Sequence, residues 1–109
     1  MKRIKFIPIE QLLEMMENND KFKLVEVLSE DSYKDGHIPG AINIPVDKLE
    51  KDSGKKLKKT DTIVVYCASY HCPASTNAAK ILLKMGYKKV SDFKGSKKTW
   101  VDAGLELEK

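Results

Sequence analysis

Residues 64–75, with the sequence VVYCASYHCPAS, decide the fold and locate the chemistry. They begin within an apolar, β-branched run, residues 63–66, that is typical of a strand. They end in residues 74–85, where apolar side chains recur at helical spacing and Gly86 follows. Cys67 therefore stands between a strand and the start of a helix. Since N–H groups and the helix dipole at such a position lower the pKa of a thiol, we predict that Cys67 is the reactive nucleophile.

Apolar runs and helical patterns alternate along the rest of the chain. Predicted strands lie at residues 4–7, 24–28, 41–44 and 89–93; predicted helices lie at residues 9–18, at a short segment capped by Ser29 that runs through Tyr33, and at residues 97–103. The lysine-rich residues 55–59 are expected to form an exposed loop. Such alternation predicts an α/β fold: a parallel sheet covered by helices on both faces, with its site at the carboxyl ends of the strands.

Length and composition indicate one domain, residues 1–109. The chain is 41% hydrophobic and 33% charged, and it is long enough for a single hydrophobic core. No apolar run reaches the length of a transmembrane helix. Glu10 and Glu14 follow the basic N-terminus before any stretch that could act as a signal sequence. We therefore expect a cytoplasmic protein without a membrane partner.

Charge and cysteine usage narrow the classes of partner. The net charge of +4 comes from nineteen lysines and one arginine that are interleaved with acidic residues. This pattern is typical of a solvated surface, so we expect no nucleic-acid partner. The two cysteines are expected to be free thiols. Because the histidines and cysteines match no paired-ligand spacing, we predict no metal site and no cofactor.

Residues 33–45, YKDGHIPGAINIP, closely resemble the Y-x-x-G-H-I-P-G-A-x-N-I-P signature of rhodanese-like domains. Three further stretches resemble motifs of that family. Residues 24–28, LVEVL, resemble its L-I-D-V-R strand, and residues 65–67, VYC, resemble its catalytic V-Y-C. Residues 93–104, FKGSKKTWVDAG, resemble its closing L-x-G-G-x-x-x-W-x-x-x-G. The resemblance spans about residues 7–105. It implies a three-layer sandwich around a five-stranded parallel sheet, and a cysteine that carries sulfane sulfur as a persulfide.

The same resemblance implies the function of a sulfurtransferase or persulfide carrier. Cys67 would take sulfur from a small donor or a persulfide-bearing protein and pass it to a thiophilic acceptor, which could itself be a protein. The N–H groups of the following loop would cradle the charged sulfur and bind the substrate. The substrate-binding residues are then Ala68, Ser69, Tyr70, His71, Cys72 and Ser75.

The loop departs from the family's C-R-x-G-x-R-S pattern. It has no arginine, is two residues longer and holds a second cysteine five positions after the first. A longer loop makes a wider anion cradle, and without arginine the bidentate recognition of an oxyanion is weaker. Leu28 replaces the family's strand-end arginine, and Ser96 replaces the second glycine of its G-G pair. The sequence therefore leaves the natural sulfur donor open.

Several side chains near the loop allow two interpretations. Cys72 either resolves a persulfide or sulfenate on Cys67 into a disulfide or packs under the loop. His71 either donates to a bound anion or faces solvent. The lysines after the last predicted strand either supply a diffuse positive field or form a solvated face; they are Lys94, Lys97 and Lys98.

Three residues are expected to be structural. His37 should hold backbone groups in its Gly-His-Ile-Pro-Gly turn, and Trp100 should pack in the core. Glu26 should reach the carboxyl edge of the sheet and bond backbone or loop groups there, because an isolated buried carboxylate is costly.

Two other classes of function compete with sulfur transfer. The missing arginines favour a non-catalytic module that uses the fold to bind a protein partner. An enlarged loop would also suit a phosphatase or arsenate reductase, which handles a tetrahedral oxyanion. These enzymes need a loop arginine for the charged transition state, so this alternative is the weakest.

Overall fold

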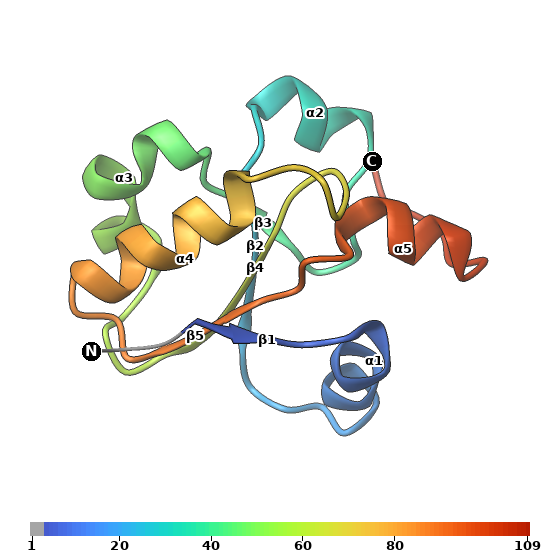
Figure 1. Cartoon of the computed structure of the whole chain (residues 1–109), viewed down its shortest axis with the longest axis horizontal. Coiled ribbons are helices and arrows are strands. Elements are labelled where there is room, and N and C mark those ends of the chain that lie inside the picture. The colour runs from blue at the N-terminus through green and yellow to red at the C-terminus, as the bar shows by residue number, and fades with distance from the viewer. Residues whose placement is uncertain (1–3) are drawn as a thin grey trace.

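The computed structural model describes residues 4–109. Its core is a sheet of five parallel strands in the order β1-β5-β4-β2-β3, with helices on both sides (Figure 1). The strands are β1 (Lys5–Phe6), β2 (Lys23–Glu26), β3 (Ile42–Asn43), β4 (Thr62–Tyr66) and β5 (Lys89–Asp92). The predicted α/β sandwich around a five-stranded parallel sheet is thus confirmed.

The helices bury one apolar core on each face of the sheet. They are α1 (Ile9–Glu17), α2 (Glu30–Asp35), α3 (Leu49–Lys56), α4 (Ala74–Lys84) and α5 (Ser96–Asp102), with a short 3-10 helix η1 (Val46–Lys48) before α3. In β4, Val65 packs in the core formed with α3 and α4, whereas Val64 and Tyr66 pack in the core formed with α1 and α5. A strand buried on both faces must be apolar throughout, which is why its sequence pattern is so clear.

The lysine-rich segment requires a correction. Lys55 and Lys56 end α3 instead of forming a loop, and Leu57 is only 5% exposed. Leu49, Ser53 and Leu57, spaced four residues apart, are buried on one face while charged residues cover the other. The lysines dominate the local composition, so this narrow apolar face was not recognised as a helix.

Side chains hold helix α2 and the turn that follows it, and His37 bonds the backbone of this turn as expected. The Ser29 hydroxyl caps α2 and accepts from the Ser32 N–H at 3.2 Å. The His37 ring stacks on Tyr33 with centroids 3.8 Å apart, and its Nδ1 lies 2.9 Å from the Tyr33 carbonyl oxygen. The backbone of His37 also exchanges two hydrogen bonds of 2.8 Å with Glu108. His37 is therefore a structural residue that ties the C-terminal segment to this turn.

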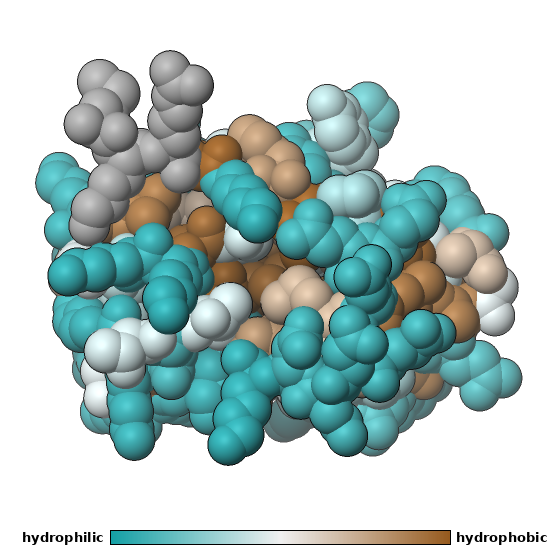
Figure 2. Space-filling view, turned by 90° about the horizontal axis from the view of Figure 1, so that it is seen from below, coloured by the Kyte–Doolittle hydropathy of each residue, from teal (hydrophilic) through white to brown (hydrophobic). Residues whose placement is uncertain are grey.

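Figure 2 shows the face on which α1 and β1 lie: hydrophilic residues cover most of it, and hydrophobic side chains come through between them. One of the exposed hydrophobic side chains is Phe6 of β1, which is 54% exposed. No helix among residues 4–109 is long and apolar enough to cross a membrane. In the same residues, no cluster of three or more His, Cys, Asp or Glu side chains could hold a metal ion.

Candidate active site

Cys67 is the first residue after β4, which lies between β5 and β2 in the middle of the sheet. Its backbone N–H donates to the Ser96 hydroxyl oxygen at 2.9 Å, and its carbonyl accepts from the Lys97 N–H at 3.2 Å. Cys67 has no exposed surface. The segment after β5 thus fixes the main chain of Cys67, while the loop of residues 68–73 covers its sulfur.

The loop makes a turn above the sulfur. The Cys72 N–H donates to the Ser69 carbonyl at 3.1 Å, and the turn carries Tyr70 and His71 outward. Tyr70 is 65% exposed, and its ring meets the His71 ring edge-on with centroids 5.8 Å apart. Of the predicted substrate-binding residues, the structure gathers Ser69, Cys72 and Ser75 around the Cys67 sulfur and leaves Ala68, Tyr70 and His71 exposed.

Two carbonyl oxygens face the sulfur. Those of Ser69 and Cys72 lie 3.8 Å and 3.4 Å from Sγ of Cys67. Of the expected series of N–H groups, the backbone N–H of Ser75 acts on the sulfur and lowers its pKa. A neutral thiol is a hydrogen-bond donor, so carbonyl acceptors suit it, whereas a thiolate or persulfide anion needs donors. These two carbonyl groups therefore favour the protonated thiol and oppose the donors around the same sulfur.

Hydroxyl and thiol donors set the acidity of Cys67. Burial raises the pKa of Cys67, but the neighbouring donors stabilise the thiolate and outweigh burial: they are the Ser75 hydroxyl, the Cys72 thiol, the Ser75 backbone N–H and the Ser96 hydroxyl. The pKa of Cys67 is therefore lower than that of an ordinary thiol. The Ser75 hydroxyl is fully buried and has no hydrogen-bond partner among residues 4–109, so its proton is free to turn toward the sulfur. A lowered pKa increases the thiolate fraction at neutral pH.

Ser96 is the site residue whose role the sequence did not reveal. It is fully buried, and its φ of 59° lies in the left-handed region that favours glycine. Its hydroxyl oxygen lies 3.8 Å from Sγ of Cys67 and also accepts from the Cys67 N–H. The chain thus keeps the backbone conformation that suits the glycine of the family motif and adds a hydroxyl beside the nucleophile. The only signal in the sequence was a serine at that glycine position.

We expect Ser96→Gly to slow the alkylation of Cys67 by iodoacetamide several-fold at neutral pH. Glycine suits the positive φ but removes a donor that stabilises the thiolate, so the pKa of Cys67 rises and less thiolate is present. The rate should be followed against pH in a Cys72→Ser background, and its midpoint should move to higher pH. Ser69→Ala is the matched control, because only the carbonyl of Ser69 contacts the sulfur. An unmoved midpoint in Ser96→Gly would show that the hydroxyl does not act on the thiol.

Lys94 is the lysine after β5 whose ammonium group reaches the loop. Its Nζ donates to the Cys72 carbonyl at 3.3 Å and lies 5.3 Å from the centroid of the Tyr70 ring. Lys98 instead pairs with Asp102 at 2.9 Å, on the exposed side of α5. The expected positive field near the sulfur is thus reduced to one flexible ammonium group.

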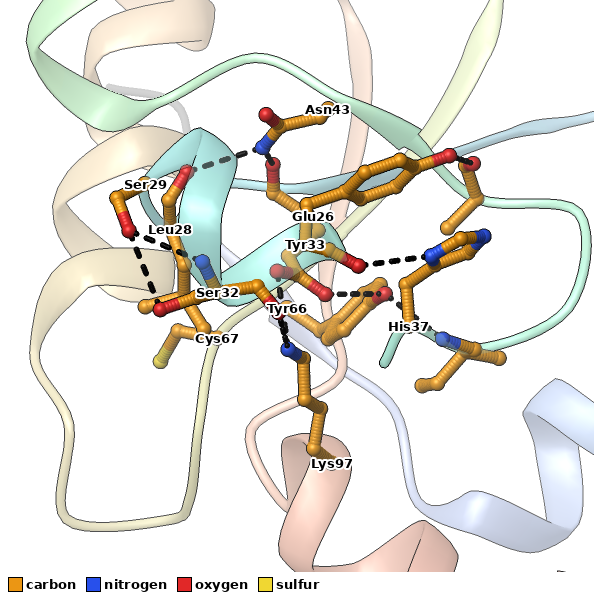
Figure 3. Close-up of polar contacts among 12 residues, drawn as sticks. Glu26, Leu28, Ser29, Ser32, Tyr33, His37, Asn43, Tyr66, Cys67 and Lys97 are labelled. Atoms are coloured by element: carbon orange, nitrogen blue, oxygen red, sulfur yellow. Dashed lines mark hydrogen bonds and ion pairs between the residues drawn. The ribbon is translucent and has the colours of Figure 1, made fainter. Parts of the chain in front are cut away.

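Lys97 belongs to a buried network with Glu26 (Figure 3). Glu26 has no exposed surface; its Oε1 accepts from the Tyr66 hydroxyl at 2.9 Å, and its Oε2 pairs with Lys97 Nζ at 3.0 Å. Burial raises the pKa of Glu26, and Lys97 and Tyr66 only partly oppose this effect. Glu26 therefore bonds two side chains rather than the backbone or loop groups we expected. Tyr66 directly precedes Cys67, and the Lys97 N–H donates to the Cys67 carbonyl. The network therefore anchors the chain where the loop begins.

These features define a class of protein: a parallel α/β sandwich with an acidic cysteine at the carboxyl end of a central strand. The family described as "Rhodanese-like domain" matches residues 8–103. The chain belongs to this family, which confirms the resemblance found in its sequence.

Known proteins similar to this chain include enzymes and a solved structure. It is 37% identical over 91 residues to "Putative thiosulfate sulfurtransferase, mitochondrial" of Schizosaccharomyces pombe, covering 72% of this chain and 63% of that protein. It is 30% identical over 103 residues to the thiosulfate sulfurtransferase GlpE of Shewanella oneidensis, covering 94% of this chain and 98% of that protein. The crystal structure of the BH2092 protein from Bacillus halodurans matches with a TM-score of 0.88 and 30% identity, covering 95% of this chain and 76% of that one. The chain thus spans less than two thirds of the length of the Schizosaccharomyces pombe protein.

Proposed function

We propose that this protein is a sulfurtransferase or persulfide carrier in which Cys67 carries the transferred sulfur. The observation that carries this proposal is the lowered pKa of a thiol fixed at the carboxyl end of the central strand. The names of the two thiosulfate sulfurtransferases among its relatives support the same activity.

The reaction has two steps. The Cys67 thiolate attacks the sulfane sulfur of the donor, so that an Sγ–S bond forms and the donor's own bond to that sulfur breaks. The leaving group, sulfite from thiosulfate or a thiolate from a persulfide, departs with the electron pair. A thiophilic acceptor then attacks the outer sulfur and releases Cys67 as a thiolate. The acceptor is a small thiol or a cysteine of a partner protein.

The loop must open before either step, because Cys67 has no exposed surface. Its covering segment, residues 68–73, is held to the rest of the chain by few hydrogen bonds. The Lys98 N–H donates to the Ala68 carbonyl, Lys94 Nζ to the Cys72 carbonyl and the Asn77 N–H to the Pro73 carbonyl; the Cys67 thiol faces the carbonyls of Ser69 and Cys72. Segments with few buried contacts open locally at low cost in free energy. Opening would also turn the two carbonyl groups away from the sulfur and so favour the thiolate.

Anionic donors would rely on Lys94. A single ammonium group holds an oxyanion less firmly than the paired arginines of the family pattern, since it lacks their planar, bidentate geometry. We therefore expect thiosulfate to be a weak donor compared with a persulfide, whose reacting sulfur needs no oxyanion site.

We expect Lys94→Met to lower kcat/KM for thiosulfate by about threefold to tenfold, the size of effect typical of one partly exposed charge. The reaction of Cys67 with uncharged iodoacetamide should not slow down, because it needs no anion site. Lys98→Met removes an equal charge that pairs with Asp102, away from the loop, and serves as the matched control. Equal losses with both variants would mean that net charge alone, and not Lys94, attracts the donor.

The proposed activity is tested by the thiocyanate that cyanide forms when it accepts the sulfur. The Cys72→Ser chain, which cannot form an internal disulfide, is supplied with thiosulfate and, separately, with cysteine persulfide. We expect several molecules of thiocyanate per chain with both donors, and faster turnover with the persulfide. Thiocyanate at the level of a protein-free control with both donors would refute the proposal.

The burial of Cys67 favours one second candidate, a binding module whose cysteine does no chemistry. The two candidates differ in the native reactivity of the thiol. For a sulfurtransferase, Cys67 reacts with iodoacetamide much faster than the whole domain unfolds, because only the loop opens. For a binding module, the rate of modification follows global unfolding and changes with denaturant in the same way.

A further inference from the structure

We propose that Cys72 resolves the Cys67 persulfide: it attacks Sγ of Cys67, forms an internal disulfide and releases hydrogen sulfide. This inference rests on the proposed function, because the reaction starts from the persulfide. It adds an activity, the reductive release of sulfide, to the transfer of sulfur between a donor and an acceptor.

The turn of the loop brings the two cysteines together. The hydrogen bond from the Cys72 N–H to the Ser69 carbonyl folds the chain back, so that the Cys72 carbonyl oxygen lies 3.4 Å from Sγ of Cys67. The Cys72 thiol is also near enough to lower the pKa of the Cys67 thiol. Both side chains pack against the same apolar cluster, and both are free thiols. The chain has only these two cysteines, so neither has another partner within the molecule.

The two thiols differ in access, which suits different roles. Cys67 is fully buried, whereas Cys72 is partly exposed at the rim of the loop. A redox pair commonly consists of one cysteine that takes up the oxidised sulfur and a nearby one that resolves it. Packing under the loop, the other interpretation of Cys72, does not require its thiol to meet the sulfur that becomes the persulfide.

The chemistry balances without an external oxidant. The Cys72 thiolate attacks Sγ of Cys67, an Sγ–Sγ bond forms, and the bond from Sγ to the outer sulfur breaks. The outer sulfur leaves as hydrosulfide with the electron pair and takes up the proton that Cys72 gave up on ionising. The two cysteines are thereby oxidised to a disulfide, and the sulfane sulfur is reduced to sulfide. A dithiol reductant is then needed to restore both thiols.

The contacts favour attack on the inner sulfur. The Cys72 carbonyl oxygen lies 3.4 Å from Sγ, the inner sulfur of the future persulfide, and the Cys72 thiol acts on the same sulfur. Hydrosulfide is a good leaving group because it is a weak base. The Lys94 ammonium group lies 3.3 Å from the Cys72 carbonyl oxygen, which itself lies 3.4 Å from Sγ, so a positive charge stands near the anion that leaves. Attack on the outer sulfur would instead move the persulfide to Cys72 and release no sulfide.

The test compares reduced wild-type chain with Cys72→Ser, Cys72→Ala and Cys67→Ser after exposure to cysteine persulfide without any added acceptor. Released sulfide is measured against the Cys67→Ser sample, and intact masses are recorded after rapid alkylation and removal of the donor. We expect about one sulfide per wild-type chain, and a monomer two hydrogen masses below the reduced protein. Both Cys72 variants should instead keep one added sulfur atom on Cys67 and release no sulfide.

Three results would overturn the inference. If wild-type chain keeps the added sulfur on Cys67 as the variants do, Cys72 does not resolve it, although the proposed function stands. If fragmentation finds the added sulfur on Cys72, Cys72 relays the persulfide instead. If neither the wild type nor the Cys72 variants gain sulfur or release sulfide, the persulfide does not form, and the proposed function fails together with this inference.

Discussion

Replacing Cys67 by serine should lower the rate of sulfur transfer by about 10⁴-fold, to the level of the uncatalysed reaction, as expected when a nucleophile is removed. A serine hydroxyl does not ionise near neutral pH and forms no persulfide, so the first step is lost with every donor. The rate of thiocyanate formation measures the effect. Activity within tenfold of the wild type would mean that Cys67 is not the carrier of sulfur.

The fold of Cys67→Ser must be checked separately, because the residue has no exposed surface. A buried hydroxyl costs about 1–3 kcal/mol if it is left unpaired, but here the carbonyls of Ser69 and Cys72 can accept its proton. We therefore expect a cooperative unfolding transition at a temperature within a few degrees of the wild type. Cys72→Ser is the matched control, since it should keep the first step of the reaction.

Replacing Lys97 by methionine should lower the free energy of unfolding by about 3 kcal/mol, a typical effect of leaving a buried charge without its partner. Lys97 Nζ lies 3.0 Å from Oε2 of Glu26, which is fully buried, and also donates to the Ser32 carbonyl at 2.9 Å. Methionine keeps most of the apolar stem but leaves Glu26 with the Tyr66 hydroxyl alone. Denaturant unfolding at neutral pH measures the loss.

The loss of stability in Lys97→Met should depend on pH. Burial raises the pKa of Glu26 in the folded wild type, and removing Lys97 raises it further, because a cation that favours the carboxylate is gone. Below the ordinary pKa of 4.5, Glu26 is protonated in the folded and unfolded chains, so the deficit is smallest there. As the pH rises, Glu26 ionises first in the folded wild type and only at a higher pH in folded Lys97→Met, so the deficit grows between these two pKa values.

Two variants separate this effect from general damage. Lys98→Met removes the neighbouring lysine, whose pair with Asp102 is exposed, and should change stability by no more than about 0.5 kcal/mol. Combining Glu26→Gln with Lys97→Met removes both charges and should recover a large part of the loss. A double variant as unstable as Lys97→Met would mean that the lysine acts through its contact with Ser32 rather than through Glu26.

The sheet and the place of Cys67 could be predicted because they rest on local patterns. A strand buried on both faces must be apolar, so residues 63–66 were recognisable, and a helix pattern directly after a short loop placed Cys67 at the carboxyl edge. Helix α3 was missed because charged residues cover most of its surface and only Leu49 and Ser53 are buried within it. Its position depends on packing against distant elements, which a local pattern does not record.

The surroundings of the sulfur could be predicted only in part. The loop residues were identified from their place in the sequence, but the direction of each side chain depends on the turn between Ser69 and Cys72. The contribution of Ser96 depends on a left-handed backbone that brings its hydroxyl to a residue far away in the chain. The pairing of Glu26 with Lys97 joins β2 to α5, and no local pattern links those two segments.

The most direct test of the account is to find the transferred sulfur on the protein. Cys72→Ser and Cys67→Ser chains are exposed to thiosulfate and to cysteine persulfide, alkylated at once, and analysed by fragmentation mass spectrometry before and after treatment with cyanide. The account predicts that a Cys72→Ser chain, in which the persulfide cannot be resolved, carries one added sulfur atom on Cys67 that cyanide removes, and that Cys67→Ser carries none. An unmodified Cys67 with both donors, in a folded Cys72→Ser chain, would contradict it.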